Sequence, residues 1–182
     1  MTEHFAEHNL IRRCCEEVHH LSGDAAEIGV YRGDSAKLIC ELLPESVVYL
    51  FDTFAGMPKE MVTAGLDAHY AGEYGDTSVD LVQAHLEGCG NFEIVRGEFS
   101  EMSHVTPTLR FVHIDCDLYK STKAAIEWAW PLLVEGGVIL DDDYHCGSCA
   151  GAAKAIDEFA KTNPDARVET VGTRAIIRRQ PS

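Results

Sequence analysis

Residues 111–119 read FVHIDCDLY, and residues 136–144 read GGVILDDDY. Each run begins with mostly apolar residues, as a buried strand does, and then continues into aspartates. In an open parallel sheet, ligands bind just beyond the carboxyl ends of the strands. We therefore expect the two runs to form strands whose carboxylates meet in one acidic pocket.

Packing alone gives no reason to gather aspartates in one pocket, because buried like charges repel one another and lose hydration. A divalent cation resolves this conflict, and a set of oxygen ligands indicates magnesium, calcium or manganese. The alternative is that the aspartates are solvated turn residues and helix caps, which Asp favours. We favour the metal site, because two separate runs end in the same way.

The composition predicts a soluble, cytoplasmic protein with one domain over residues 1–182. The chain has no run of eighteen apolar residues, and its acidic start is unlike a signal peptide. Its seven cysteines are an odd number, which favours reduced thiols. The net charge of −15 argues against nucleic-acid and membrane partners and suits a protein that binds a cation.

Apolar runs alternate with helical patterns along the chain. We expect a helix over 9–21 within an N-terminal helical segment, 1–23, and further helices over 36–43, 77–87, from 121 or 122, and over 150–161. Five strands are expected at 25–30, 47–51, 92–96, 111–115 and from 136, followed by a hairpin of 167–171 and 173–178. The predicted fold is therefore an α/β, Rossmann-like, seven-stranded and mostly parallel sheet with helices on both faces and a C-terminal antiparallel hairpin.

The first strand and the turn after it have the composition of a nucleoside site. Gly29 and Gly33 let the backbone approach a ligand closely, and Asp52 follows Glu27 by about the interval at which an acid meets a ribose. The Gly-x-x-x-Gly spacing differs from the Gly-x-Gly-x-x-Gly pattern that binds a pyrophosphate. This difference argues against NAD and FAD.

Two further stretches have open interpretations. Residues 53–76, which include His69 and Tyr74, form a long connection that is either a functional lid or a disordered segment. Cys146 and Cys149 form a Cys-x-x-Cys pair before a helix, a zinc or redox pattern. A structural zinc site needs four ligands, and the chain has no second pair, so this interpretation is the weaker one.

Five segments together resemble the macrocin O-methyltransferase (TylF-type) family of class I, S-adenosylmethionine-dependent methyltransferases. They are EIGVYRGDS at 27–35, YLFDTFAGMP at 49–58, DTS at 76–78, HIDCDLYKST at 113–122 and GGVILDDDY at 136–144. The resemblance implies a magnesium-dependent O-methyltransferase acting on a sugar or other natural-product hydroxyl. Asp141 stands where the family usually has an apolar residue.

The resemblance also implies the site residues. It implies that Glu27, Gly29 and Asp52 line the cofactor site. It implies that Asp115, Asp142 and Asp143 hold the divalent ion. Around the cofactor we expect in addition Tyr31, Gly33, Ser35, Thr53, Gly97, Phe99 and Asp115.

For the reaction, one group must take the proton of the acceptor hydroxyl. The first candidate is Asp115, with Asp117 and His145 as alternatives. We expect a small hydroxylated substrate and leave a homodimer open. The competing hypothesis is a non-catalytic protein that keeps the fold and the nucleoside pocket.

Overall fold

The computed structural model describes residues 3–99, 105 and 107–179 of the chain, so residues 1–2 of the predicted N-terminal segment lie outside the described residues. The helices are α1 (Glu3–Val18), α2 (Asp34–Leu42), α3 (Val79–His85), α5 (Tyr119–Leu132) and α6 (Ala150–Thr162). The strands are β1 (Asp24–Ile28), β2 (Val48–Asp52), β3 (Phe92–Arg96), β4 (Leu109–Ile114), β5 (Leu133–Asp141), β6 (Ala166–Val171) and β7 (Arg174–Arg179).

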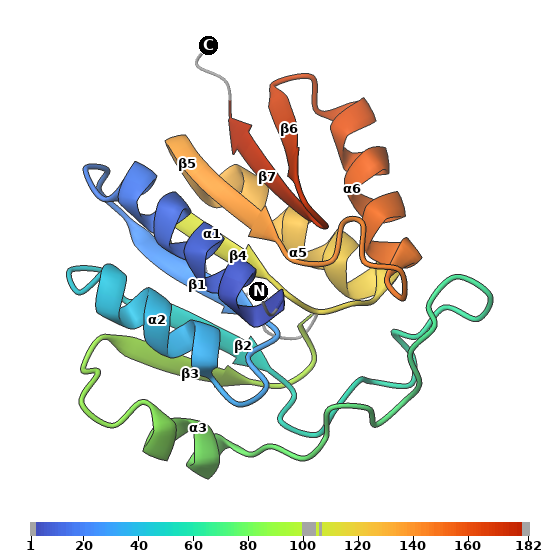
Figure 1. Cartoon of the computed structure of the whole chain (residues 1–182), viewed down its shortest axis with the longest axis horizontal. Coiled ribbons are helices and arrows are strands. Elements are labelled where there is room, and N and C mark those ends of the chain that lie inside the picture. Colours follow the sequence, from blue (N-terminus) through green and yellow to red (C-terminus); the bar gives the residue numbers. More distant parts are fainter. Residues whose placement is uncertain (1–2, 100–104, 106, 180–182) are drawn as a thin grey trace.

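These strands form one seven-stranded sheet in the order β3-β2-β1-β4-β5-β7-β6 (Figure 1). The first five strands pair in parallel, whereas β7 runs antiparallel to both β5 and β6. The strand order reverses between β1 and β4, the place where sheets of this type bind ligands. The predicted fold class, including the terminal hairpin, is confirmed.

Helices cover both faces of the sheet. Successive strand residues point to opposite faces, so Ala25 joins the core under α1 and α2, whereas Ala26 joins the core under α5 and α6. Figure 1 shows α1 and α2 in front of the sheet and α5 behind it. Apolar residues therefore make up most of the packing on both faces, and the polar side chains of the cavity gather beyond the strand ends.

Several element boundaries differ from the sequence-based prediction. Helix α5 begins at Tyr119 because the Asp67 carboxylate, from a distant loop, accepts a hydrogen bond from the Tyr119 amide at 3.0 Å. Strand β5 already begins at Leu133, which is buried, and the glycine pair lies inside the strand. Gly136 has φ 79°, and the pairing of β4 with β5 is irregular there. Helix α1 starts six residues before the predicted position and ends three residues earlier.

The connection from β2 to α3 runs beyond the carboxyl ends of the strands. It contains turns but no helix or strand over residues 53–78. The loop closes on itself through two hydrogen bonds, from the Met57 amide to the Glu73 carbonyl and from the Gly72 amide to the Met57 carbonyl, both 2.9 Å. Its far end is held where the Tyr31 hydroxyl donates to Asp76 at 2.9 Å. These contacts favour the lid interpretation over a disordered segment.

Among the helices of the described residues, none is both long enough and apolar enough to cross a bilayer.

Candidate active site

The backbones of β1 and β4 touch where the two strands end. Gly29 has φ 89°, and a Cβ atom added there would lie 1.8 Å from the carbonyl oxygen of Asp115. The Gly29 amide donates to the Phe51 carbonyl at 3.0 Å, and the Asp115 amide donates to the Ile28 carbonyl at 2.9 Å. Only glycine fits this position, so the close approach of β1, β2 and β4 depends on it.

The Asp52 carboxylate organises the turn after β1. One oxygen accepts hydrogen bonds from the Val30 and Tyr31 amides, both at 2.8 Å, and the other accepts from the Phe54 amide at 2.7 Å. The side chain thus connects the glycine turn to the start of the 53–78 loop. A carboxylate has about four acceptor positions, so it retains capacity for a ligand hydroxyl.

A cavity of about 220 Å³ lies beyond these strand ends. Its wall includes these predicted cofactor residues: Gly29, Tyr31, Asp52, Thr53, Gly97, Phe99 and Asp115. The 53–78 loop adds Met57, Pro58, Met61, Glu73 and Tyr74. The cavity therefore lies between the sheet edge and the predicted lid.

Three predicted cofactor residues lie elsewhere. Glu27 is fully buried on the face covered by α1 and α2, and its carboxylate pairs with Nδ1 of His113 at 2.8 Å. Gly33 is the residue preceding α2, with φ 87°, and Ser35 is buried in the first turn of that helix. None of the three is among the residues that line the cavity, so their contact with the cofactor stays a prediction.

Three carboxylates converge next to the cavity. Oxygens of Asp115, Asp117 and Asp143 lie within 4.8 Å of one another, and the Asp117 amide donates to Asp143 at 2.8 Å. Strand β4 ends at Ile114 and Asp117 has φ 59°, so a left-handed turn brings its carboxylate back to Asp115.

The electrostatics of this group fit a divalent cation. Burial and the charges of Asp143 and Asp142 raise the pKa of Asp115 well above its usual range. Burial and the charge of Asp117 raise the pKa of Asp143 to about 7. The pKa of the buried Asp141, whose Oδ1 accepts from the Asp143 amide at 3.0 Å, is also raised, mainly by burial. An ion with oxygen ligands would relieve this repulsion.

The Asp142 carboxylate pairs with an arginine of the C-terminal hairpin. Arg174, which is buried at the start of β7, donates to one oxygen of the Asp142 carboxylate through Nε and to the other through Nη2, the latter at 3.1 Å. The same carboxylate groups with Glu7 and His113 rather than with the other aspartates. The predicted role of Asp142 as a metal ligand therefore stays a prediction.

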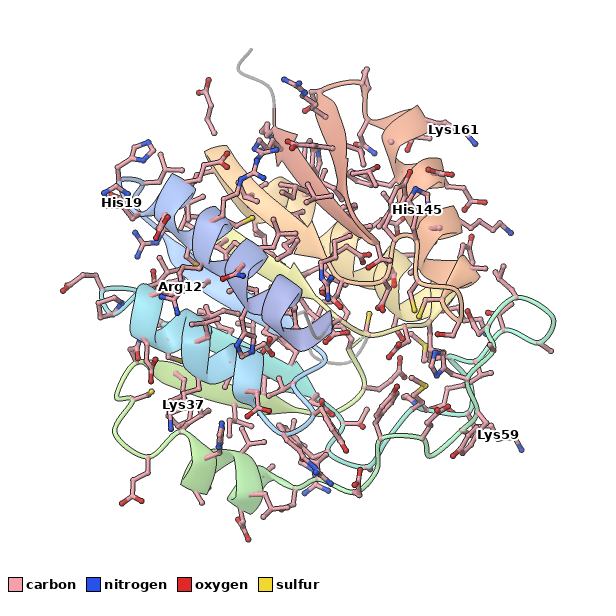
Figure 2. All side chains as sticks on the ribbon, viewed as in Figure 1. Arg12, His19, Lys37, Lys59, His145 and Lys161 are labelled. Atoms are coloured by element: carbon pink, nitrogen blue, oxygen red, sulfur yellow. The ribbon has the colours of Figure 1, made fainter. Side chains whose placement is uncertain are left out.

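The histidine that lies beside the carboxylates is His69, not the predicted His145. His145 is exposed, and its ring lies against Tyr144 with centroids 4.3 Å apart, near α6 and outside the cavity wall (Figure 2). His69, from the lid loop, instead reaches Asp117, with Nε2 3.5 Å from Oδ1. The sequence offered only a weak signal for His69, namely a histidine four residues before Glu73 in a long loop.

The Cys-x-x-Cys pair lies beside the same carboxylates. The Cys149 thiol donates to Asp117 at 3.3 Å and lies 3.7 Å from Nε2 of His69. Cys146 groups with Cys149 and Asp143. All seven cysteines are free thiols in this structure.

The strand order, the antiparallel hairpin and the cavity at the topological reversal define the class I methyltransferase fold. The solved structure of the O-methyltransferase NovP superposes with a TM-score of 0.85 over 97% of this chain and 80% of that chain, at 23% identity. A model of the macrocin-O-methyltransferase (TylF) family matches residues 7–179. The chain belongs to this family.

Two curated relatives extend the comparison. The 8-demethyl-8-(2,3-dimethoxy-alpha-L-rhamnosyl)-tetracenomycin-C 4'-O-methyltransferase of Streptomyces olivaceus is 31% identical over 71% of this chain and 56% of its own length. The demethyldecarbamoylnovobiocin O-methyltransferase of Streptomyces niveus is 31% identical over 82% of this chain and 63% of its own length. The chain thus spans less than two thirds of each relative.

Proposed function

We propose that this chain is an S-adenosylmethionine-dependent O-methyltransferase, assisted by a divalent cation, that methylates a hydroxyl of a sugar or another small natural product. The observation that carries the proposal is the convergence of Asp115, Asp117 and Asp143 beside a cavity walled by Gly29 and Asp52. Family membership and a relative whose name includes a rhamnosyl substrate support this substrate class.

The part of the cavity that would hold the cofactor lies at the carboxyl ends of β1 and β2. S-adenosylmethionine would supply a methyl group on a positively charged sulfonium, which suits an acidic site. Gly29 gives its backbone the freedom to lie against the ligand, and Asp52 has acceptor capacity for ribose hydroxyls. Phe51 and Phe99, packed edge to face at 5.4 Å, add an apolar surface to this half.

The metal half is the group of carboxylates after β4 and β5. Asp115, Asp117 and Asp143 would hold the ion, with magnesium as the first candidate from their oxygen chemistry. A cation there would supply Lewis-acid polarisation and orientation of the acceptor hydroxyl.

The chain's own groups would complete the reaction. Asp115 is the proposed acceptor of the hydroxyl proton, and Asp117, which also lines the cavity, is the alternative. Met57, Met61 and Tyr74 of the lid loop would exclude water and shape the acceptor side. These loop residues are where we expect substrate choice to be decided.

The test is a methyl-transfer assay, read by mass spectrometry, across a panel of hydroxylated glycosides and aglycones. Each reaction is run with S-adenosylmethionine plus magnesium and again in excess chelator. Asp143→Asn removes one proposed ligand, and Asp80→Asn on the exposed surface of α3 is the matched control. S-adenosylhomocysteine affinity is measured for every variant by calorimetry.

We expect transfer to a glycoside that requires magnesium and falls at least 100-fold in Asp143→Asn, with cofactor affinity and the Asp80→Asn control unchanged. Full activity in chelator or in Asp143→Asn would remove the metal from the mechanism. Cofactor binding without transfer to any glycoside or aglycone would favour the non-catalytic alternative. A protein that binds no cofactor would overturn the proposal as a whole.

A further inference from the structure

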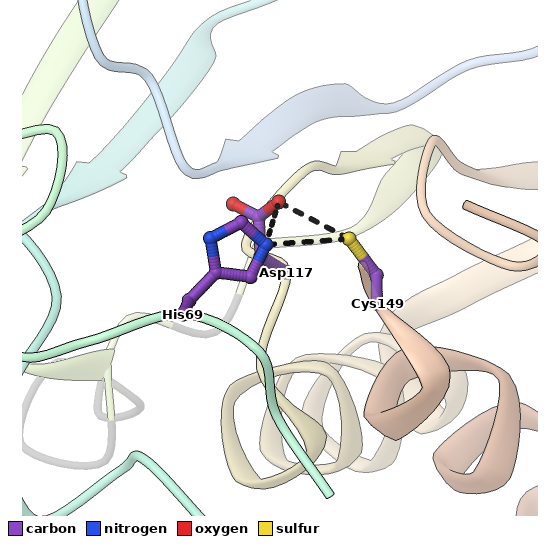
Figure 3. Close-up of side chains that lie close together, drawn as sticks. All are labelled: His69, Asp117 and Cys149. Atoms are coloured by element: carbon purple, nitrogen blue, oxygen red, sulfur yellow. Dashed lines mark hydrogen bonds and ion pairs between the residues drawn. The ribbon is translucent and has the colours of Figure 1, made fainter. Parts of the chain in front are cut away.

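Three side chains from distant parts of the chain meet beside the carboxylate group. His69 comes from the lid loop, Asp117 from the turn after β4, and Cys149 from the position preceding α6 (Figure 3). Their imidazole, carboxylate and thiol groups point toward one another. The reaction proposed above uses neither the imidazole nor the thiol.

The distance between His69 and Asp117 fits a metal site better than a direct hydrogen bond, and the two distances to sulfur are compatible with the same site. Nε2 of His69 lies 3.5 Å from Oδ1 of Asp117 and 3.7 Å from Sγ of Cys149, and Sγ lies 3.3 Å from Oδ1. In tetrahedral zinc, bonds of about 2.3 Å to sulfur and about 2.0–2.1 Å to nitrogen and oxygen place the ligand atoms about 3.3–3.6 Å apart. A charged N–H···O hydrogen bond would instead bring His69 and Asp117 to about 2.7–2.9 Å.

A second observation concerns the orientation of His69. Its other ring nitrogen, Nδ1, pairs with the Glu73 carboxylate at 3.1 Å, and only 8% of its side chain is exposed. A carboxylate on one nitrogen fixes the ring and directs the other nitrogen toward the metal, as in carboxylate–histidine–zinc triads. Glu73 therefore gives His69 the surroundings of a metal ligand.

From this geometry we propose that His69, Asp117 and Cys149 form a zinc site that fastens the lid loop to the sheet edge, with water as the fourth ligand of the tetrahedral ion. The mixed nitrogen, oxygen and sulfur set selects a borderline-soft ion such as Zn²⁺ over Mg²⁺. The thiol must lose its proton to bind, and that proton goes to solvent. The carboxylate of Asp117 has two oxygens, so it can serve this site and the neighbouring all-oxygen group together.

The functional consequence follows from the ligands' positions. His69 lies on the same loop as Glu73 and Tyr74, which line the cavity, whereas Asp117 and Cys149 belong to the sheet edge and α6. An ion bound to all three ties the loop to both elements. Zinc would thus hold the wall of the cavity in place.

The test is metal binding by the full chain, reduced and stripped with chelator, with Co²⁺ as the spectroscopic probe. Millimolar Mg²⁺ is present throughout, to occupy the all-oxygen group. Thiolate-to-cobalt charge-transfer absorption reports a bond to cysteine, and competition with Zn²⁺ measures zinc affinity. The variants are Cys149→Ser and His69→Asn, with Cys89→Ser and His20→Asn as matched controls elsewhere in the fold. Circular dichroism verifies that each variant is folded.

We expect one equivalent of cobalt with a thiolate band that zinc displaces, no band in Cys149→Ser, and at least tenfold weaker binding in His69→Asn. Both controls should bind as the unaltered chain does, and zinc should protect the lid loop from proteolysis except in His69→Asn. A thiolate band that survives in Cys149→Ser, or its absence from the unaltered chain, would overturn the proposal. If Cys149→Ser does not fold, an unchanged cobalt affinity in His69→Asn would overturn the proposal instead. These readouts do not depend on methyl transfer, so they separate this proposal from the enzyme assignment.

Discussion

Replacing Gly29 by alanine tests the contact between β1 and β4 on which the site depends. The new Cβ would lie 1.8 Å from the Asp115 carbonyl oxygen and 2.7 Å from its carbonyl carbon. Non-bonded heavy atoms prefer about 3.5 Å, so the backbone at Asp115 would have to move by roughly 1.7 Å. This movement would carry the Asp115 carboxylate away from Asp117 and Asp143.

The energetic cost has two parts. A left-handed residue other than glycine costs about 1–2 kcal/mol, and forced overpacking costs about 1–3 kcal/mol more. Gly88→Ala provides the control, because Gly88 has φ 98° and a Cβ there would meet no atom within 4 Å. We therefore expect Gly88→Ala to lower the free energy of unfolding only by the cost of the left-handed backbone, about 1–2 kcal/mol. Gly29→Ala should lower it by about 2–5 kcal/mol in total.

Urea unfolding gives the stabilities of both variants, and calorimetry with S-adenosylhomocysteine gives their cofactor affinities. Where Gly29→Ala folds, we expect weaker cofactor binding and about 100-fold slower methyl transfer, since misplacement of a reacting group by about 1 Å has such an effect. Gly88→Ala should bind cofactor normally. Equal stabilities to within about 0.5 kcal/mol, with equal affinities, would refute the argument from close approach.

Three further predictions address the cofactor site, the helix α1 and the lid. Asp52→Ala should weaken S-adenosylhomocysteine binding at least tenfold by calorimetry; unchanged affinity would contradict the ribose role. The hydrogen bond from Arg178 lowers the pKa of Glu17, so this pair stabilises the fold at neutral pH and loses its effect as the pH falls through that lowered pKa. Glu17→Gln should therefore cost about 0.5–1 kcal/mol in urea unfolding at pH 7 and progressively less as the pH falls through that lowered pKa, and a loss independent of pH would reject the ion pair. Asp67→Ala should remove the cap on Tyr119, cost about 1 kcal/mol and speed proteolysis of the lid loop; an unchanged cleavage rate would argue against this anchor.

Local sequence was a sufficient guide to the sheet because each strand carries its own signal. The buried run 109–114 and the apolar residues of 138–140 are recognisable without any partner, and parallel strands covered by helices need such runs. Helix starts were less predictable. The residues near Tyr119 give no sign of a helix cap, because the carboxylate that accepts from the Tyr119 amide belongs to Asp67, 52 positions away in the chain.

The chain by itself determined that aspartates of two strands would gather at one edge, since parallel strands end on the same side. Only the tertiary structure decided which of them meet. Asp142 forms an ion pair with Arg174 of the hairpin. A left-handed turn places the Asp117 carboxylate beside those of Asp115 and Asp143. His69 joins them from a loop that has no periodic pattern to reveal its path. Strand identity follows from short-range hydrophobic pattern, whereas the partner of a charged side chain depends on which distant groups the completed fold places within its reach.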